Sequence, residues 1–237
     1  MRMKTIIVIE HSIHPEPDAG LAHLANRRCT IRRVRPFAGD QLPDPADADG
    51  VILTGGPQMV TDLADAPYLL SEMDFAMRAV ERGIPLLAIC LGAQMIAHRL
   101  GAAVDWHPDG AVAFGYHQLT PTAAANGLFP PGLQVLSGNA QGFELPPGAT
   151  LLAQGETWPN QAFALDAHVL AFQFHPEVTR RILDAWQDDL ADYAGRPGAA
   201  DPATQDADFD RHDPALKTWY RSLLDGFFGL EDFDPPA

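Results

Sequence analysis

The chain has 237 residues, of which 46% are apolar, so it is long enough to bury one sizeable hydrophobic core. Its formal net charge of -15 argues against nucleic acid as a partner. No apolar run approaches the roughly 18 residues that a membrane span needs. Two cysteines are too few for a disulfide framework, which makes a reducing cytoplasm the expected location.

The first apolar run follows two basic residues and is too short for a signal peptide, so it is interpreted as the first β-strand. The strand patterns, in chain order, cover residues 5–9, 29–34, 50–53, 85–89 and 169–173. Helical patterns cover residues 72–82 and 91–100. Strands that alternate with helices predict an α/β fold, with an open, mostly parallel central sheet flanked by helices.

Residues 102–165 have a different pattern, in which short β-like pieces alternate with turns rich in Pro and Gly. This pattern predicts antiparallel hairpins that extend the sheet within a single domain of residues 1–237, whose core is about 4–190. A helix is expected over 177–193, an irregular surface loop over 195–213 and a final helix over 214–228.

Cys90 stands where an apolar strand pattern changes directly into a helical pattern. Its neighbours Ala88 and Gly92 are small, as a sharp turn between strand and helix requires. At the N-terminus of a helix, free N–H groups and the helix dipole favour a thiolate. We therefore interpret Cys90 as a nucleophile, whereas Cys29 lacks such surroundings and is interpreted as a core residue. The alternative for Cys90 is a buried structural cysteine.

His175 and Glu177 follow the apolar run 169–173 and are two residues apart. In a strand, residues i and i+2 point the same way, so the carboxylate could orient the imidazole. Parallel sheets bind ligands beyond the carboxyl ends of their strands. Gly55, Gly56, Cys90 and His175 all fall at such ends, and nucleophile, base and orienting acid are then present together.

Three segments carry a resemblance to the class I glutamine amidotransferases, of the kind found in GMP synthases. They are Gly50-Val-Ile-Leu-Thr-Gly-Gly-Pro57, Cys90-Leu-Gly-Ala-Gln94 and Phe172-Gln-Phe-His-Pro-Glu177. The resemblance covers roughly residues 4–190 and implies a flavodoxin-like fold. It also implies cysteine-dependent hydrolysis of the γ-amide of glutamine through a thioester.

The same resemblance implies roles for further residues. The N–H groups of Gly56 and Leu91 would form the oxyanion hole, and Gly55 and Gln94 would contact the substrate. The alternatives are a tight turn after a strand for the glycines and a position on the helix surface for Gln94. The chain departs from the family at Asn139 and Gln141, where related sequences often carry His and Asp, and this departure leaves the substrate open.

No phosphate-binding loop or dinucleotide fingerprint occurs, and the histidines show no repeated ligand spacing. No cofactor, metal, nucleic acid or membrane is therefore expected. The released ammonia would go to a separate synthetase subunit. One alternative is a γ-glutamyl peptidase or hydrolase that needs no partner, and another is an inactive binding or regulatory protein.

Overall fold

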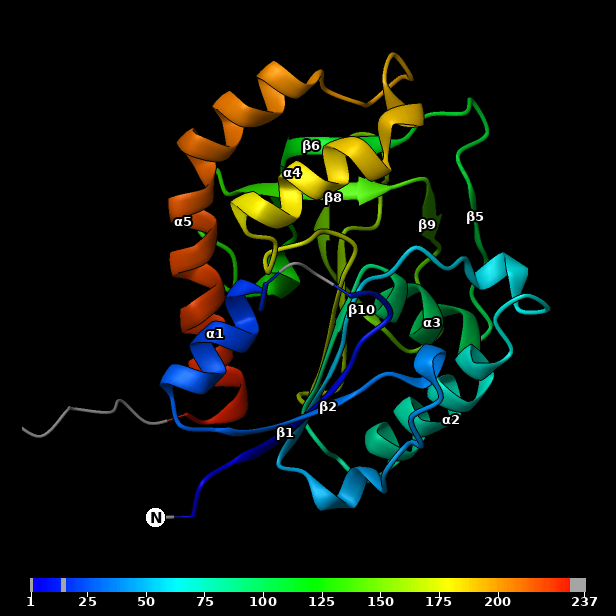
Figure 1. Ribbon diagram of the computed structural model, residues 1–237, viewed down its shortest axis with the longest axis vertical. Coiled ribbons are helices and arrows are strands. Elements are labelled where there is room, and N and C mark those ends of the chain that lie inside the picture. Colours follow the sequence, from blue (N-terminus) through cyan, green and yellow to red (C-terminus); the bar gives the residue numbers. More distant parts are fainter. Residues whose placement is uncertain (1, 14–15, 231–237) are drawn as a thin grey trace, which may run out of the picture.

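The computed structural model describes residues 2–13 and 16–230, and its centre is an eight-stranded sheet (Figure 1). The order of the strands is β2-β1-β3-β4-β12-β11-β10-β7. The parallel strands are β1 (Thr5–Ile9), β2 (Thr30–Val34), β3 (Gly50–Leu53), β4 (Leu86–Ile89) and β12 (Val169–Phe172). The sheet continues antiparallel through β11 (Ala162–Leu165), β10 (Thr150–Gln154) and β7 (Thr120–Pro121). The predicted fold class, with its antiparallel extension, is confirmed.

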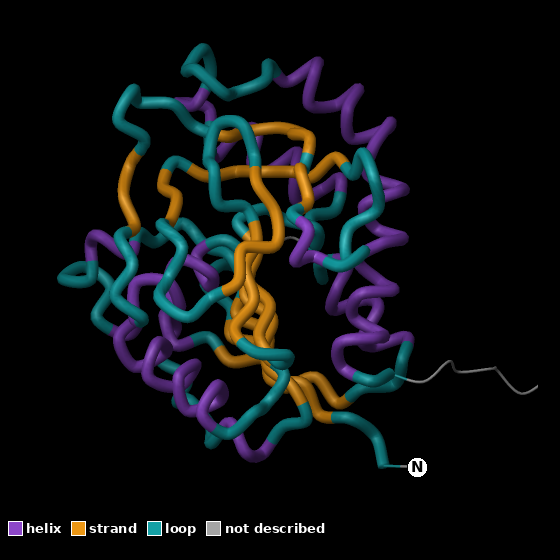
Figure 2. The backbone as a smooth tube through the Cα atoms, turned by 180° about the vertical axis from the view of Figure 1, so that it is seen from behind, coloured by secondary structure: helices purple, strands orange, loops and turns teal. Residues whose placement is uncertain are grey.

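Helices cover both faces of this sheet (Figure 2). One face carries α1 (Ala19–Asn26), α4 (Arg180–Asp189) and α5 (Pro202–Phe228), and the other carries α2 (Tyr68–Glu81) and α3 (Leu91–Arg99). Alternate residues of β1 divide between the two cores, with Ile6 in one and Ile7 in the other. Because β1, β3 and β4 are buried on both faces, their sequences are almost continuously apolar.

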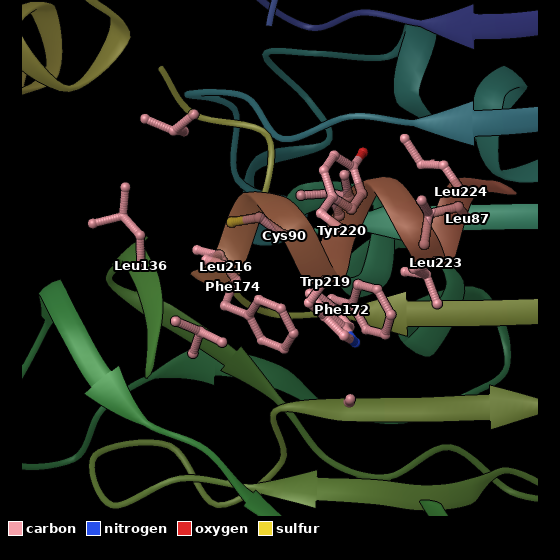
Figure 3. Packing of buried hydrophobic residues seen from close by; sticks show 14 of the residues in the cluster. Leu87, Cys90, Leu136, Phe172, Phe174, Leu216, Trp219, Tyr220, Leu223 and Leu224 are labelled. Carbon is pink, nitrogen blue, oxygen red and sulfur yellow. The ribbon is translucent and has the colours of Figure 1, made fainter. Parts of the chain in front are cut away.

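An aromatic block fills the core beneath α5 (Figure 3). The rings of Phe172 and Phe174 stack with their centroids 5.0 Å apart, and Trp219 of α5 lies 5.8 Å from Phe172. Cys90 belongs to the same buried cluster. The carboxyl ends of β4 and β12 are thus supported from below by close-packed rings.

Four of the described strands lie outside the large sheet. They form two antiparallel pairs, β6 (Ala113–Gln118) with β8 (Gln134–Asn139) and β5 (Val104–Trp106) with β9 (Gln141–Phe143). The expected hairpins over 102–165 therefore extend the sheet in part and stand as separate pairs in part. Short 3-10 turns occupy Pro36–Ala38, Pro45–Asp47, Val60–Asp62, Ala123–Ala125 and Ala191–Tyr193.

The irregular loop predicted over 195–213 is wrong from residue 202 onward, where α5 begins. Asp201 caps this helix by accepting a hydrogen bond from the Thr204 N–H at 3.0 Å, and Pro202 occupies the first turn. The helix predicted over 177–193 is also too long, since α4 begins after its cap residue Thr179 and ends at Asp189. Among the described residues, no helix is both long and apolar enough to cross a membrane.

Candidate active site

Three parallel strands end at one edge of the sheet and define the candidate site. Leu53 of β3 pairs with Ala88 of β4, and Phe172 of β12 pairs with Ile89 of β4. The residues that follow these strand ends therefore meet. Five of the site residues predicted from the sequence line one cavity of about 170 Å³. They are Gly55, Gly56, Cys90, His175 and Glu177.

Cys90 forms the turn between β4 and α3 with φ 48° and ψ -105°, a backbone conformation that residues other than glycine rarely adopt. Its N–H donates to the Phe172 carbonyl at 2.7 Å, which fixes the turn to β12. A Cβ atom at Gly92 would lie 2.7 Å from the Leu53 carbonyl oxygen. The small residue at position 92 is thus required by close packing of α3 on β3.

His175 and Glu177 form a buried pair in the bend after β12. The imidazole Nδ1 lies 2.7 Å from Glu177 Oε1, and the His175 N–H donates to the Leu136 carbonyl at 2.7 Å. Both residues lie beyond the strand, so the i, i+2 alternation of a strand does not explain their contact. The indole of Trp186 packs edge-on against the imidazole, with centroids 4.7 Å apart.

The electrostatic surroundings of His175 favour its charged form. Burial lowers the pKa of the imidazole, but the opposing charges of Glu177 and Cys90 outweigh burial and raise that pKa to about 10. These surroundings therefore favour an imidazolium at His175 at neutral pH, and Cys90 lines the same cavity.

Gly55 and Gly56 leave no room for a side chain. A Cβ atom at Gly55 would lie 2.5 Å from His175 Cε1, and one at Gly56 would lie 2.3 Å from the Cβ of His11. Leu91 is the first residue of α3, so its N–H has no partner within the helix. At Gly55 and Gly56 the absence of a side chain is therefore what allows the backbone to lie this close to His175 and His11.

Gln94 does not line the cavity, although it was expected to contact the substrate. It is buried, and its Nε2 donates to the Gln141 carbonyl at 2.8 Å and to Gln173 Oε1 at 3.3 Å. The side chain of Asn139 also donates to the Gln141 carbonyl, at 3.0 Å. Within the described chain, the side-chain oxygens of Asn139 and Gln141 are buried without a hydrogen-bond partner.

Asp18 is a buried residue of the cavity wall that sequence reasoning missed. Its carboxylate caps α1 by accepting from the Leu21 N–H at 2.8 Å, and the adjacent Ala19 N–H donates to the Glu177 carbonyl at 2.8 Å. Burial, reinforced by the charge of Glu177, raises the pKa of the Asp18 carboxyl to about 7. An Asp before a short apolar helical pattern is a typical capping signal that could have identified it.

The cavity wall also includes Ser12 and Trp186, which carry no recognisable sequence motif. No group of three or more His, Cys, Asp or Glu side chains that could hold a metal ion occurs among residues 2–13 and 16–230.

Known proteins resemble this chain in sequence and in fold. A family model described as glutamine amidotransferase class-I matches residues 20–185. The glutamine amidotransferase-like protein YfeJ of Salmonella typhimurium is 32% identical over 204 residues, which cover 79% of this chain and 83% of YfeJ. The GMP synthase of Herminiimonas arsenicoxydans is 35% identical over 163 residues, covering 63% of this chain but 29% of that enzyme.

Two solved structures share the fold over nearly the whole chain. A glutamine amidotransferase from Methylobacillus flagellatus superposes with a TM-score of 0.87 at 23% identity, covering 99% of this chain and 98% of that chain. A glutamine amidotransferase from Thermotoga maritima gives a TM-score of 0.85 at 25% identity, covering 96% and 99%. With the family model spanning well over half of its residues, the chain belongs to the class-I glutamine amidotransferases.

Proposed function

We propose that the cavity at Cys90 hydrolyses the γ-amide of glutamine through a γ-glutamyl thioester and releases ammonia to a separate acceptor enzyme. The observation that carries this proposal is the meeting of Cys90, on its strained turn, with the His175–Glu177 pair in one cavity. A nucleophile, a proton carrier and an orienting carboxylate are the groups that covalent acyl transfer requires.

In the proposed reaction, the Cys90 thiolate attacks the γ-carbonyl carbon, and a sulfur–carbon bond forms. The His175 imidazolium gives its proton to the amide nitrogen as the carbon–nitrogen bond breaks, so that ammonia leaves. His175, now neutral, takes a proton from water as that water attacks the thioester, and glutamate is released with recovery of the thiolate. The raised pKa of His175 supports the charged starting state.

The negative oxygen that develops on the γ-carbonyl would be stabilised by the N–H groups of Gly56 and Leu91. Removing one such donor typically costs about 10²–10³ in rate. Glu177 would hold the imidazole ring and stabilise its positive charge, at the 2.7 Å separation that the pair has. Gly55 would allow the substrate to approach the backbone, whereas the position of Gln94 supports an indirect role through Gln141 and Gln173.

The acceptor of ammonia is inferred from relatives. GMP synthases are named as glutamine-hydrolysing, and this chain matches less than a third of the length of the one from Herminiimonas arsenicoxydans. We infer that a separate synthetase subunit would take the ammonia that this chain releases. The cysteine usage supports a reducing cytoplasm as the location of the reaction.

A second candidate is a γ-glutamyl peptidase or hydrolase that needs no partner. The support for it is the departure at Asn139 and Gln141, where related sequences often carry His and Asp. The wall formed by Trp186 and Leu190 offers an apolar surface to a larger leaving group. The third candidate, an inactive binding protein, is disfavoured because Cys90, His175 and Glu177 are all present.

Steady-state rates on glutamine and on γ-glutamyl dipeptides, measured without a partner, test these candidates. Cys90→Ala should abolish turnover on the preferred substrate, whereas Cys29→Ala, which removes the other cysteine, should retain it. Equal turnover by wild type and Cys90→Ala would refute the catalytic role. Failure of a thiol-reactive glutamine analogue to label Cys90 in the folded protein would favour the inactive alternative.

A further inference from the structure

A second histidine–glutamate pair lies directly behind the cavity. The Nε2 atom of His11 is 2.7 Å from Glu72 Oε2, and the side chains of both residues are 0% exposed. His11 follows β1, and Glu72 comes from the middle of α2. Two polar side chains withdrawn completely from water are costly to bury unless they are hydrogen-bonded, so their position requires an explanation.

The hydrogen bonds of His11 fix the direction of one peptide group. Its Nδ1 atom lies 3.0 Å from the carbonyl oxygen of Thr54, the residue that follows β3. A carbonyl oxygen can only accept, so Nδ1 must carry a proton and donate it. Glu72, at Nε2, keeps the ring in the orientation that makes this donation possible, as a carboxylate does for other functional histidines.

The next peptide group is held by Thr54 itself. The Thr54 hydroxyl donates to the carbonyl oxygen of Gly55 at 3.1 Å. In a trans peptide the C=O and N–H groups point in opposite directions, and the described residues contain no cis peptide bond. Fixing the Gly55 carbonyl therefore also fixes the direction of the Gly56 N–H.

Packing closes this arrangement from behind. A Cβ atom at Gly56 would lie 2.3 Å from the Cβ of His11, so the turn rests directly on the histidine. The side-chain amide of Gln58 donates to the His11 carbonyl at 3.0 Å, and the Thr54 N–H donates to the Ile9 carbonyl at 3.1 Å. The residues before and after the Gly55–Gly56 turn are thus bonded to Ile9 and His11, neither of which lines the cavity.

We propose that His11 and Glu72, together with Thr54, are positioning residues that hold the Gly55–Gly56 turn so that the Gly56 N–H stays aimed at the reacting carbonyl. This inference rests on the proposed function, since it gives that N–H a role in acyl transfer. It assigns a purpose to two buried ionisable side chains that the reaction itself does not use.

Two matched substitutions at His11 test the hydrogen bond. The amide nitrogen of Asn is as many bonds from Cα as Nδ1 of His, so His11→Asn keeps a donor for the Thr54 carbonyl. His11→Leu has the same branched shape without a donor, and both variants lose the contact with Glu72 equally. At Thr54, which lines the cavity, Thr54→Ser keeps the hydroxyl and Thr54→Val keeps the shape alone.

Three measurements on each variant separate positioning from other effects. They are kcat and KM on the preferred γ-glutamyl substrate, the rate of Cys90 alkylation by iodoacetamide, and the backbone amide signals of Gly55 and Gly56 in nitrogen-15 spectra. Alkylation displaces iodide from a saturated carbon and creates no oxyanion. The rate of Cys90 alkylation therefore depends on the reactivity of the thiolate and not on the Gly56 N–H.

We expect kcat to fall roughly tenfold to a hundredfold in His11→Leu relative to His11→Asn, and likewise in Thr54→Val relative to Thr54→Ser. KM and the alkylation rate should change by less than about twofold, and the two glycine signals should move only in the variants without a donor. Equal kcat within each matched pair, unmoved glycine signals, or parallel losses of kcat and alkylation would each overturn the proposal. A wild-type protein that is alkylated but turns over no γ-glutamyl compound would refute the proposed function instead, and the glycine signals would still test the positioning of the turn.

Discussion

The carboxylate of Glu177 gives one oxygen to His175 and leaves the other without a protein partner. Oε1 lies 2.7 Å from Nδ1 of the imidazole, whereas Oε2 is buried and accepts no hydrogen bond within the described residues. The charge of Glu177 is therefore not divided among several donors. It acts on the imidazole in surroundings from which water is largely excluded, where charges interact strongly.

Glu177→Gln should lower turnover by about a hundredfold or more while leaving the fold intact. Gln keeps the size and a hydrogen-bonding group but removes the charge that raises the pKa of His175. The imidazolium should then lose its proton at a lower pH, so the alkaline limb of kcat/KM should move to lower pH. A pH–rate profile and a thermal melt on the same preparation check both parts.

Asp225→Asn is a matched control for this substitution. Asp225 accepts hydrogen bonds from His23 at 2.7 Å and from Arg27 Nε at 2.8 Å, in a further histidine–carboxylate contact that joins α1 to α5 and does not line the cavity. We expect its kcat and pH profile to equal those of wild type. If Glu177→Gln keeps wild-type turnover, or if it unfolds, Glu177 is a structural residue.

Gly92→Ala should destabilise the protein by about 1–3 kcal/mol, because the added methyl group would overlap the Leu53 backbone, which cannot move without disturbing β3. Gly226→Ala provides the contrast, since Gly226 is also helical but has open space around its Cβ position. That substitution should stabilise the protein by about 0.5–1 kcal/mol. Urea unfolding of the two variants would contradict the packing argument if both changes had the same sign.

Much of the fold could be predicted because its central strands are apolar on both faces. The sequence patterns placed β1 and β3 at their observed bounds, and β2, β4 and β12 within one residue. The site residues that could be predicted are those at strand ends, since topology alone gathers them at one edge of the sheet.

The sequence patterns did not predict the first half of α5, which buries few apolar side chains, or the single polar residues His11 and Asp18. In the first twelve residues of α5, only Gln205 and Phe209 are buried, so that half of the helix has no apolar periodicity to reveal it. His11 and Asp18 gain their surroundings from residues far away in sequence, Glu72 and Glu177 respectively. Such contacts exist only after the sheet has assembled.

Asp201→Ala should lower the melting temperature by a few degrees, because it removes the side chain that caps α5. The Asp201 carboxylate accepts hydrogen bonds from both the N–H and the hydroxyl of Thr204, at 3.0 Å and 2.8 Å. Asp201→Asn keeps a capping oxygen and should melt close to wild type. Circular dichroism melts of the two variants check this, and equal losses in both would show that charge rather than capping matters.

The free energy of unfolding of Asp18→Asn, measured relative to that of wild type, should be higher at pH 8 than at pH 5. The folded-state pKa of Asp18 is raised from 3.8 to about 7, so the native carboxyl keeps its proton over a range in which the unfolded chain has lost it. Its stabilising contribution is complete below the unfolded value and is lost as pH rises through about 7. Asn caps α1 as well as Asp does and never ionises, so the difference between pH 5 and pH 8 should be on the order of 2 kcal/mol.

Urea unfolding of Asp18→Asn and wild type at both pH values measures this difference. Asp201→Asn is the control, because hydrogen bonds to Thr204 lower the pKa of the exposed Asp201 carboxyl, which therefore does not titrate between pH 5 and pH 8. A stability difference between Asp18→Asn and wild type that stays constant from pH 5 to pH 8 would mean that Asp18 is already ionised beside Glu177 at pH 5.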